Sequence, residues 1–374
     1  PNRLVRRLLD RWPLSRQRAV FEELRGGPLR EEPESKKLFP PSNRAADVRD
    51  ALRFAVAAAG TSLRASAPVR DVACAGDGFA VRLDGDEEIR APRVILATGG
   101  RSVLAGSADA AGFEWAAAMG HTVRPTYPAL APLTGDAPAH HALAGVSLAA
   151  RVTARSADDR ATSSGGFLFT HKGWSGPAVL DVSHVVERAR LAGRTAEVRV
   201  CFGFGEERRE EKIASNGPLQ GAGAAPVGGA PAVATAWDEG LRAGARFSGG
   251  RSLSSFLSRS SSSLPDRLAS LILETAQVPD TQLSHLSRDA RTRVAETLTA
   301  FPLPATGTEG YRTAEVTGGG VALEEVDPGS GLSRLVPGLY LAGEILDAFG
   351  PIGGFNFQWA WATGRTAGEA VARA

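Results

Sequence analysis

The sequence predicts an α/β fold, and three observations lead to this prediction. Apolar, strand-like runs end in glycine-containing turns at residues 94–100 and again at residues 336–344. A glycine-rich loop followed by a helix comes directly after the second of these runs. Between the two runs the pattern changes to short alternating stretches, which is typical of antiparallel β-structure. We therefore expect a domain with parallel strands whose chain is interrupted by a second, β-rich region.

The composition limits the classes of function. The chain has 374 residues, with 43% hydrophobic and 22% charged residues, which is enough for two domains and a sizeable core. Its net charge of +2 gives no reason to expect a nucleic-acid partner. No run of eighteen apolar residues could span a membrane, and no signal-peptide core is present at the start of the sequence. We expect a cytoplasmic protein, or an organellar one if a transit peptide has been lost.

The cysteine and histidine content also limits the classes of function. Cys74 and Cys201 are the only cysteines and lie far apart, which fits a reducing compartment without disulfide bonds. No cluster of cysteines or histidines offers a metal site. His140 and His141 follow a proline, and we expect both to be solvated in a loop.

The N-terminal third predicts helices followed by a meander. Apolar spacing over residues 4–24 predicts two short helices separated at Pro13. Residues 45–59 predict a third helix, because Val48, Leu52, Ala55, Val56 and Ala59 recur on one face. Three short strands follow at residues 69–74, 79–83 and 87–89, with Asp-Gly turns between them, and they lead into the strand at residues 94–97.

The middle of the chain alternates and then loses its pattern. Residues 112–120 predict a helix that ends at a glycine, and strands follow at residues 146–152, 167–169 and 198–202. Residues 203–263 are rich in Gly, Ala, Pro and Ser, so we expect an insertion without a core of its own. We expect residues 206–250 of it to be cut readily by proteases. Helices resume at residues 266–276 and 288–301.

The C-terminal forty residues carry the strongest functional signal. A strand ends in Gly343 and Glu344, and Gly353 and Gly354 precede a helix that contains Trp359. Ligands of α/β proteins bind beyond the carboxyl ends of parallel strands, against helix N-termini. The Glu can accept hydrogen bonds from a polyol, the glycines let backbone approach a flat ring, and the helix N-terminus favours negative charge. Together these features fit a flavin.

Several blocks resemble the BaiN-like, or aminoacetone-oxidase-like, FAD-dependent oxidoreductases. The similarity covers nearly the whole chain, and six blocks occur in the family's order. They are residues 37–48, residues 94–100, residues 128–133, residues 168–178, residues 316–321 and the tail at residues 336–361. Trp359 and Trp361 belong to the last block; they lie on opposite sides of a helix, so at least one must face the core.

The resemblance implies an FAD/NAD(P)-binding Rossmann-like domain with a β-meander, interrupted by an inserted β-barrel and a small helical bundle. The FAD-binding domain would comprise residues 1–124 and 311–374, and the insert residues 125–310. Within the insert we expect the barrel at residues 125–202, the low-complexity insertion at residues 203–263 and the bundle at residues 264–303. The family's N-terminal strand and Gly-x-Gly-x-x-Gly turn have no counterpart in this sequence. We therefore expect a fragment or an incomplete gene model that retains FAD poorly.

The same resemblance supplies candidate site residues. Contacts with FAD are expected from the strand-end turns, the glycine loop, the start of the last helix and the meander, namely Val69, Thr98, Gly99, Gly100, Gly343, Glu344, Asp347, Gly353, Gly354, Asn356 and Gln358. Asn356 and Gln358 could instead cap the helix locally. His171 is a weak candidate for a catalytic proton donor, and a supporting role in a turn of the insert is the favoured interpretation.

The sequence thus predicts an FAD-dependent oxidoreductase that moves a hydride between flavin and a small organic substrate, with NAD(P)H as a possible partner. The substrate, the direction of transfer and the oligomeric state stay open. One alternative is a flavin-dependent tRNA-modifying protein, because proteins related to glucose-inhibited division protein A carry a strand similar to residues 338–344. A degenerate chain that no longer binds flavin is the other alternative.

Overall fold

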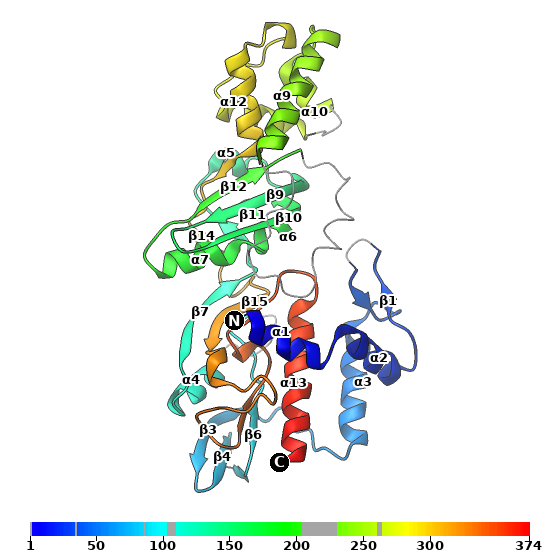
Figure 1. Cartoon of the computed structure of the whole chain (residues 1–374), viewed down its shortest axis with the longest axis vertical. Helices are drawn as coiled ribbons and strands as arrows, with labels where there is room; N and C mark the ends of the chain where they lie inside the picture. The colour runs from blue at the N-terminus through cyan, green and yellow to red at the C-terminus, as the bar shows by residue number, and fades with distance from the viewer. Residues whose placement is uncertain (1, 34–35, 86, 103–109, 204–229, 260–263) are drawn as a thin grey trace. The chain divides into compact units, whose positions relative to one another are not determined.

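The computed structural model describes residues 2–33, 36–85, 87–102, 110–203, 230–259 and 264–374 (Figure 1). The chain divides into two compact units. Unit 1 comprises residues 1–126 and 316–374, and unit 2 is the single segment of residues 127–315. The polypeptide therefore leaves unit 1, builds unit 2 and returns. The predicted α/β class is confirmed.

Unit 1 is built on short sheets. Strands β6 (Val94–Leu96) and β16 (Leu339–Leu341) pair in parallel, with Leu339 opposite Val94 and Leu341 opposite Leu96. Strand β15 (Val316–Val321), which is buried along its whole length, pairs with β7 (Val123–Ala129). The predicted meander is present as β3 (Val69–Ala75), β4 (Gly78–Leu83) and β5 (Glu88–Ala91), and a further two-stranded sheet is formed by β1 (Arg30–Glu31) and β2 (Leu38–Phe39).

The helices of unit 1 follow the predicted order. Pro13 separates α1 (Asn2–Arg11) from α2 (Leu14–Arg25), because its missing N–H suits a helix start and not a helix interior. The other helices are α3 (Ala45–Ala58), α4 (Ala111–Ala118) and α13 (Phe355–Arg373), with 3-10 turns η4 (Leu323–Glu325) and η5 (Gly343–Ile345). Helix α3 has the predicted apolar face, but none of its residues is buried, and Leu52 stays 37% exposed.

Unit 2 contains one antiparallel sheet of seven strands in the order β13-β12-β9-β10-β11-β8-β14. Its longest strands are β9 (Ser147–Arg155) and β10 (Arg160–Phe169), and the others are β8 (Leu133–Thr134), β11 (Gly173–Ser175), β12 (Glu197–Cys201), β13 (Phe301–Leu303) and β14 (Gly307–Thr308). The edge strands β13 and β14 are joined by only three residues, which reach about 15 Å. A flat sheet would hold its edges about 29 Å apart, so this sheet must curl as a barrel does.

The helices of unit 2 complete its core. Helices α5 (Pro138–His141), α6 (Pro177–Leu180) and α7 (Ser183–Leu191) accompany the sheet. The bundle consists of α9 (Ala230–Phe247), α10 (Leu253–Arg259), η3 (Leu283–His285), α11 (Asp266–Thr275) and α12 (Arg288–Thr299). Phe167, Phe202 and Phe301 are fully buried where sheet and bundle share one apolar cluster.

The interpretation of residues 206–250 as an unpacked insertion is wrong for α9, which packs into the apolar cluster that the sheet and the bundle share. Trp237 and Leu241 lie one turn apart on α9 and are buried, as are Leu253 and Leu257 on α10. An amphipathic helix in a bundle needs only about one large apolar residue per turn. Small residues on the same face then permit close packing: a Cβ on Gly244 would lie 2.6 Å from the Phe256 ring. Residues 204–229 and 260–263 lie outside the described residues.

The expectation that His140 is solvated is also wrong. His140 lies in α5, is 8% exposed, and its ring stacks on Phe301 at 5.0 Å and meets Trp174 edge-on at 5.5 Å. Burial, with a smaller contribution from the neighbouring His141, lowers its pKa to about 4. His140 is therefore a neutral member of the aromatic core. His141 is half-buried, and its Nε2 lies 3.0 Å from the Gly135 carbonyl oxygen.

Candidate functional site

The carboxyl ends of β6 and β16 form the edge at which the candidate site lies. The parallel register extends beyond the strands, because the Ala342 N–H donates to the Leu96 carbonyl at 3.0 Å. The turn at Thr98 and Gly99 and the turn at Gly343 therefore leave the sheet side by side. This is the edge at which α/β proteins bind ligands.

Glu344 is the centre of the site. Its Oε1 accepts the backbone N–H of Thr317 at 2.6 Å, so the turn after β16 is joined to the start of β15. A Cβ built on Gly100 would lie 2.4 Å from that same Oε1 and 2.4 Å from the Thr317 hydroxyl oxygen. Only glycine fits at position 100. The Thr317 hydroxyl also accepts the N–H of Arg101 at 2.7 Å, which closes this turn over the carboxylate.

The surroundings of Glu344 favour its neutral form. Burial raises the pKa of the carboxyl above its ordinary value of 4.5, and this effect outweighs the hydrogen bonds from Thr317, which act to lower it. The side chain is only partly exposed. A buried carboxyl of this kind can accept a hydroxyl proton, or donate one when it is protonated, and both suit a ligand with several hydroxyl groups.

The turn at Gly343 is fixed against α13. Gly343 has φ +80°, its N–H donates to the Thr363 hydroxyl at 2.8 Å, and its carbonyl accepts Trp359 Nε1–H at 3.0 Å. Thr363 and Trp359 are both buried. The expectation that at least one of the two tryptophans faces the core is met by Trp359. Two side chains of the helix therefore hold the strand end at which Glu344 begins its turn.

The N-terminus of α13 carries the predicted glycine loop. Gly353 has φ +142°, and Gly354, the N-cap, has φ +89°, with no side-chain cap on the first turn. A Cβ on Gly354 would meet no atom within 4 Å, so backbone is open to an approaching ring there. Asn356 turns back to the loop: its Oδ1 accepts the Gly350 N–H at 2.8 Å and its Nδ2 donates to the Gly350 carbonyl at 3.1 Å.

Four further residues that are predicted to contact the cofactor lie in different parts of unit 1. Gln358 is 8% exposed, and its N–H donates to the Gly354 carbonyl. The hydroxyl of Thr98 is buried without a hydrogen-bond partner among the described residues and faces α4. Asp347 pairs with Arg124 at 2.9 Å. Val69 begins β3, next to a register shift. For these residues, contact with a cofactor stays a prediction.

His171 lies in unit 2, in the tight turn between β10 and β11, and is exposed. The turn is closed by the Thr170 N–H, which donates to the Gly173 carbonyl at 2.9 Å. None of the predicted cofactor residues belongs to unit 2. Among the residues that the structure describes, the His171 side chain forms no hydrogen bond or ion pair, and its catalytic role stays a weak candidate.

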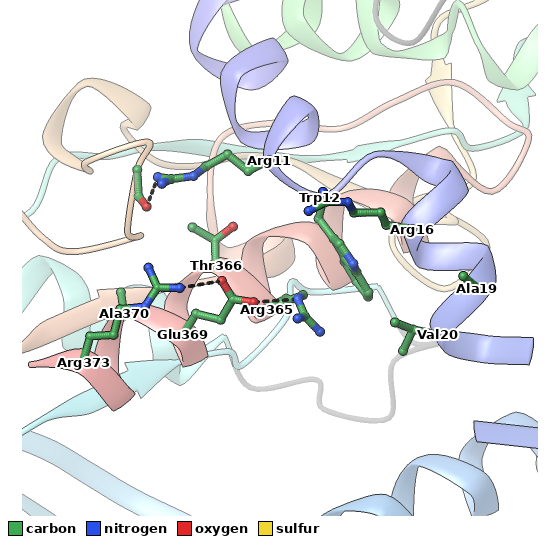
Figure 2. Close-up of a pocket in the computed structure, with 11 residues that line it drawn as sticks. Arg11, Trp12, Arg16, Ala19, Val20, Arg365, Thr366, Glu369, Ala370 and Arg373 are labelled. Atoms are coloured by element: carbon green, nitrogen blue, oxygen red, sulfur yellow. Dashed lines mark hydrogen bonds and ion pairs between the residues drawn. The ribbon is translucent and has the colours of Figure 1, made fainter. Parts of the chain in front are cut away.

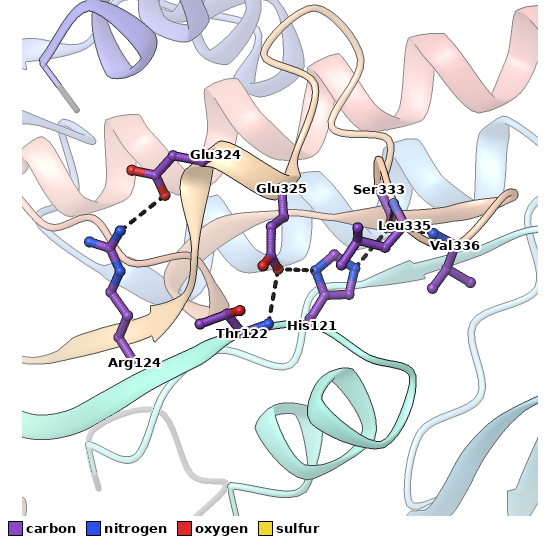
Figure 3. A network of polar contacts seen from close by, with 8 residues as sticks. All are labelled: His121, Thr122, Arg124, Glu324, Glu325, Ser333, Leu335 and Val336. Carbon is purple, nitrogen blue, oxygen red and sulfur yellow. Dashed lines mark hydrogen bonds and ion pairs between the residues drawn. The ribbon is translucent and has the colours of Figure 1, made fainter.

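A second polar network connects the segment after α4 with η4 and the loop before β16 (Figure 3). His121 Nδ1 lies 3.0 Å from Glu325 Oε2, and His121 Nε2 lies 2.8 Å from the Ser333 hydroxyl. Burial acts to raise the pKa of Glu325, but hydrogen bonds from Thr122 and His121 hold it below the usual range. We therefore assign the Nδ1 proton to the bond with the ionised Glu325.

This Ser–His–Glu series does not form a nucleophilic site. The Ser333 hydroxyl already accepts the N–H groups of Leu335 and Val336 at 3.0 and 2.9 Å, and the His121 side chain is fully buried. The network connects the β15–β16 segment to the rest of unit 1. Sequence reasoning missed both this network and Thr317; the threonine before three glycines in β15 was the one available signal.

A metal centre and a membrane-spanning helix are both absent from the described part of the chain. No group of three or more His, Cys, Asp or Glu side chains there could hold a metal ion. Likewise, no helix in that part is long and apolar enough to cross a membrane. Cys74 is exposed and Cys201 is buried, and both are free thiols.

Comparison with known proteins defines the class. Residues 2–370 match the HI0933-like protein Rossmann domain. The chain is 30% identical to the 3-dehydro-bile acid delta(4,6)-reductase of Clostridium scindens over 94% of this chain and 77% of that protein. It is 31% identical to the ribosomal RNA dihydrouridine synthase of Escherichia coli over 81% of this chain, and 28% identical to that of Haemophilus influenzae over 78%. The chain spans 66% of the length of each of these two synthases.

The fold and the family match together define a Rossmann-like protein. The chain belongs to the family of the HI0933-like protein Rossmann domain, and the predicted family is thereby confirmed.

Proposed function

We propose that this chain binds FAD at the edge where β6 and β16 end. The observation that carries the proposal is the convergence of Gly100, Thr317 and the partly buried carboxyl of Glu344 at the strand end that α13 holds in place. These residues fit the cofactor: Glu344 would hold ribityl hydroxyl groups, and backbone at Gly354 would lie against the flavin ring. The 19-residue α13 would favour negative charge at its N-terminus. When bound, FAD supplies two-electron chemistry as a hydride carrier.

We further propose that the reaction is reduction of a carbon–carbon double bond conjugated to a carbonyl group. The bile-acid enzyme is named for reduction of such bonds, and dihydrouridine is uridine with its ring double bond reduced. Both names imply the same chemistry: a hydride is added to an electron-poor carbon, and a proton is added to the neighbouring carbon. NAD(P)H is proposed as the source of the hydride.

Anaerobic spectroscopy tests this proposal. Purified protein loaded with FAD is reduced with NADPH and then mixed with a steroid 4-en-3-one or with a uridine-containing RNA. We expect the flavin absorbance to return with one of the two, with the saturated product formed in equal amount. Loss of FAD binding in Glu344→Ala, with retention in Glu23→Ala at an exposed site of unit 1, would support the assigned position. A protein that stays reduced with both acceptors and reoxidises only with oxygen would contradict the reaction.

The second candidate substrate is a uridine within RNA. It is favoured by the names of the Escherichia coli and Haemophilus influenzae relatives. The net charge of the whole chain gave no reason to expect a nucleic-acid partner. A net charge does not show where the charged side chains lie, so a local cluster of positive charge in unit 1 would still allow RNA to bind.

A further inference from the structure

A pocket of about 280 Å³ lies where the α1–α2 corner meets the C-terminal half of α13 (Figure 2). Four arginines line it, Arg11, Arg16, Arg365 and Arg373, together with a single carboxylate, Glu369. These five residues, here named the arginine pocket, carry a net charge of +3, against +2 for the whole chain. The net charge of the remainder of the protein is therefore close to zero, and this pocket is a local cluster of positive charge.

The arginines are only partly neutralised by neighbours. Glu369 forms ion pairs with two of them, Arg365 at 2.8 Å and Arg373 at 3.4 Å. All three side chains are at least 44% exposed, so these ion pairs are weak. Arg11 donates to the Gly329 carbonyl, which carries no full charge. The Arg16 side chain has no hydrogen bond or ion pair with any residue in the described part of the chain.

One guanidinium is held in place in advance. The Arg365 guanidinium lies over the Trp12 ring, 5.3 Å from its centroid, and Trp12 is buried. A cation over an aromatic face is attracted to the ring and loses rotational freedom. The planar guanidinium then presents its N–H groups in a fixed direction, which suits a phosphate oxygen pair.

The packing of α1 does not require these charges. Val5, Leu8 and Leu9 bury its apolar face, while Arg6, Arg7 and Arg11 are exposed on the other side. The side chains of Arg6 and Arg7 also have no hydrogen bond or ion pair among the residues that the structure describes. Arg7 lies one turn before Arg11, so the basic face of α1 continues the pocket along the helix. A phosphate site that continues as a basic surface favours a polymeric anion over a single free phosphate.

We propose that the arginine pocket binds a backbone phosphate of RNA. The choice of RNA rests on the second candidate substrate above, and the phosphate chemistry rests on the pocket alone. The neighbouring Arg6 and Arg7 would contact adjoining phosphates. Such contacts position an RNA without reading its sequence, so the base to be reduced would be selected elsewhere.

The test measures the affinity of the protein for a fluorescently labelled, single-stranded RNA of about twenty nucleotides, which is long enough for several phosphate contacts. Binding is measured by fluorescence anisotropy, without reductant. The double variant Arg11→Ala/Arg16→Ala should bind on the order of tenfold more weakly. The plot of log affinity against log salt should become less steep by about 1.4, which corresponds to two lost contacts with a single strand. Arg246→Ala/Arg251→Ala removes two exposed arginines of unit 2 and is the matched control.

Two further measurements keep the result interpretable. Arg16→Glu changes a side chain without any structural partner, so weaker RNA binding there cannot come from a lost contact within the fold. ATP is titrated as a free nucleotide phosphate. Weaker ATP binding in the double variant together with unchanged RNA binding would assign the pocket to a nucleotide and overturn the proposal. RNA affinity equal to that of the control variant would overturn it as well.

Turnover is measured separately with the steroid enone. If RNA binding depends on the pocket but no acceptor reoxidises the flavin, the proposed reaction fails and the pocket stands. If the enone is reduced and the substitutions in the arginine pocket leave RNA binding unchanged, the reaction stands and the pocket assignment fails.

Discussion

The carboxylate of Glu344 accepts the backbone N–H of Thr317 at 2.6 Å, although 26 residues separate them in the chain. This bond joins the turn after β16 to the start of β15. A parallel bridge between Val321 and Leu346 continues the same contact, and the Asp347 N–H donates to the Val321 carbonyl at 2.9 Å. The candidate cofactor edge is therefore made of two segments that support each other.

Glu344→Gln is predicted to change how stability depends on pH. Burial raises the pKa of Glu344, so the folded protein keeps this proton to a higher pH than the unfolded chain does. The contribution to stability is fully present below the ordinary pKa of 4.5 and is lost as pH rises through the raised value. The melting temperature of the variant should therefore gain on wild type as pH rises above 4.5. A parallel pH profile for the two proteins would contradict the assignment, and Glu239→Gln on α9 is the exposed control.

Gly354→Val is predicted to weaken FAD binding by roughly tenfold or more, because the branched side chain would occupy the space where backbone should meet the ring. No protein atom lies within 4 Å of the added Cβ, but φ +89° costs roughly 1–2 kcal/mol of stability. Melting without FAD measures that cost separately from the flavin titration. Gly364→Ala lies in the interior of α13 with open space around it, and it should keep its affinity while gaining about 0.5–1 kcal/mol. Unchanged affinity in Gly354→Val would remove this loop from the site.

His140→Leu is predicted to make the free energy of unfolding depend less on pH at acidic pH. The folded pKa of about 4 lies below the ordinary value of 6.5, so the unfolded chain takes up the proton first. Wild type should lose up to about 3 kcal/mol of unfolding free energy as pH falls from 6.5 to 4, and the variant should lose less. Chemical denaturation at several pH values measures the difference. His285→Gln changes an exposed histidine and should leave the profile of wild type intact.

Trp237→Ala is predicted to destabilise unit 2 by about 3–5 kcal/mol. The indole is buried against Gly203, and its Nε1–H donates to the Phe202 carbonyl at 3.3 Å. Phe247→Ala, at the end of the same helix and 86% exposed, should change stability by less than about 0.5 kcal/mol. Equal effects of the two substitutions in thermal unfolding would mean that α9 does not pack as described.

The sequence by itself determined the elements that depend on short-range rules. Pro13 separates two helices, Asp-Gly turns mark the meander, and the glycine-bounded runs at residues 94–100 and 336–344 predict a pair of strands with a site at their ends. Gly343, Glu344, Gly353 and Gly354 are predicted as site residues in this way, because backbone freedom and a carboxylate at a strand end are visible in the chain itself.

Tertiary structure decided what depends on long-range contact. The burial of His140 comes from Phe301 and Trp174, which are distant in sequence, and α9 forms a core only because α12 and the sheet meet its single apolar stripe. The Asn356 amide closes the loop at Gly350, and this contact depends on the fold of the loop. Contact of Asn356 with the cofactor stays a prediction. The net charge of +2 gave no sign of the arginine pocket, because a sum over the chain carries no information about where folding gathers charges.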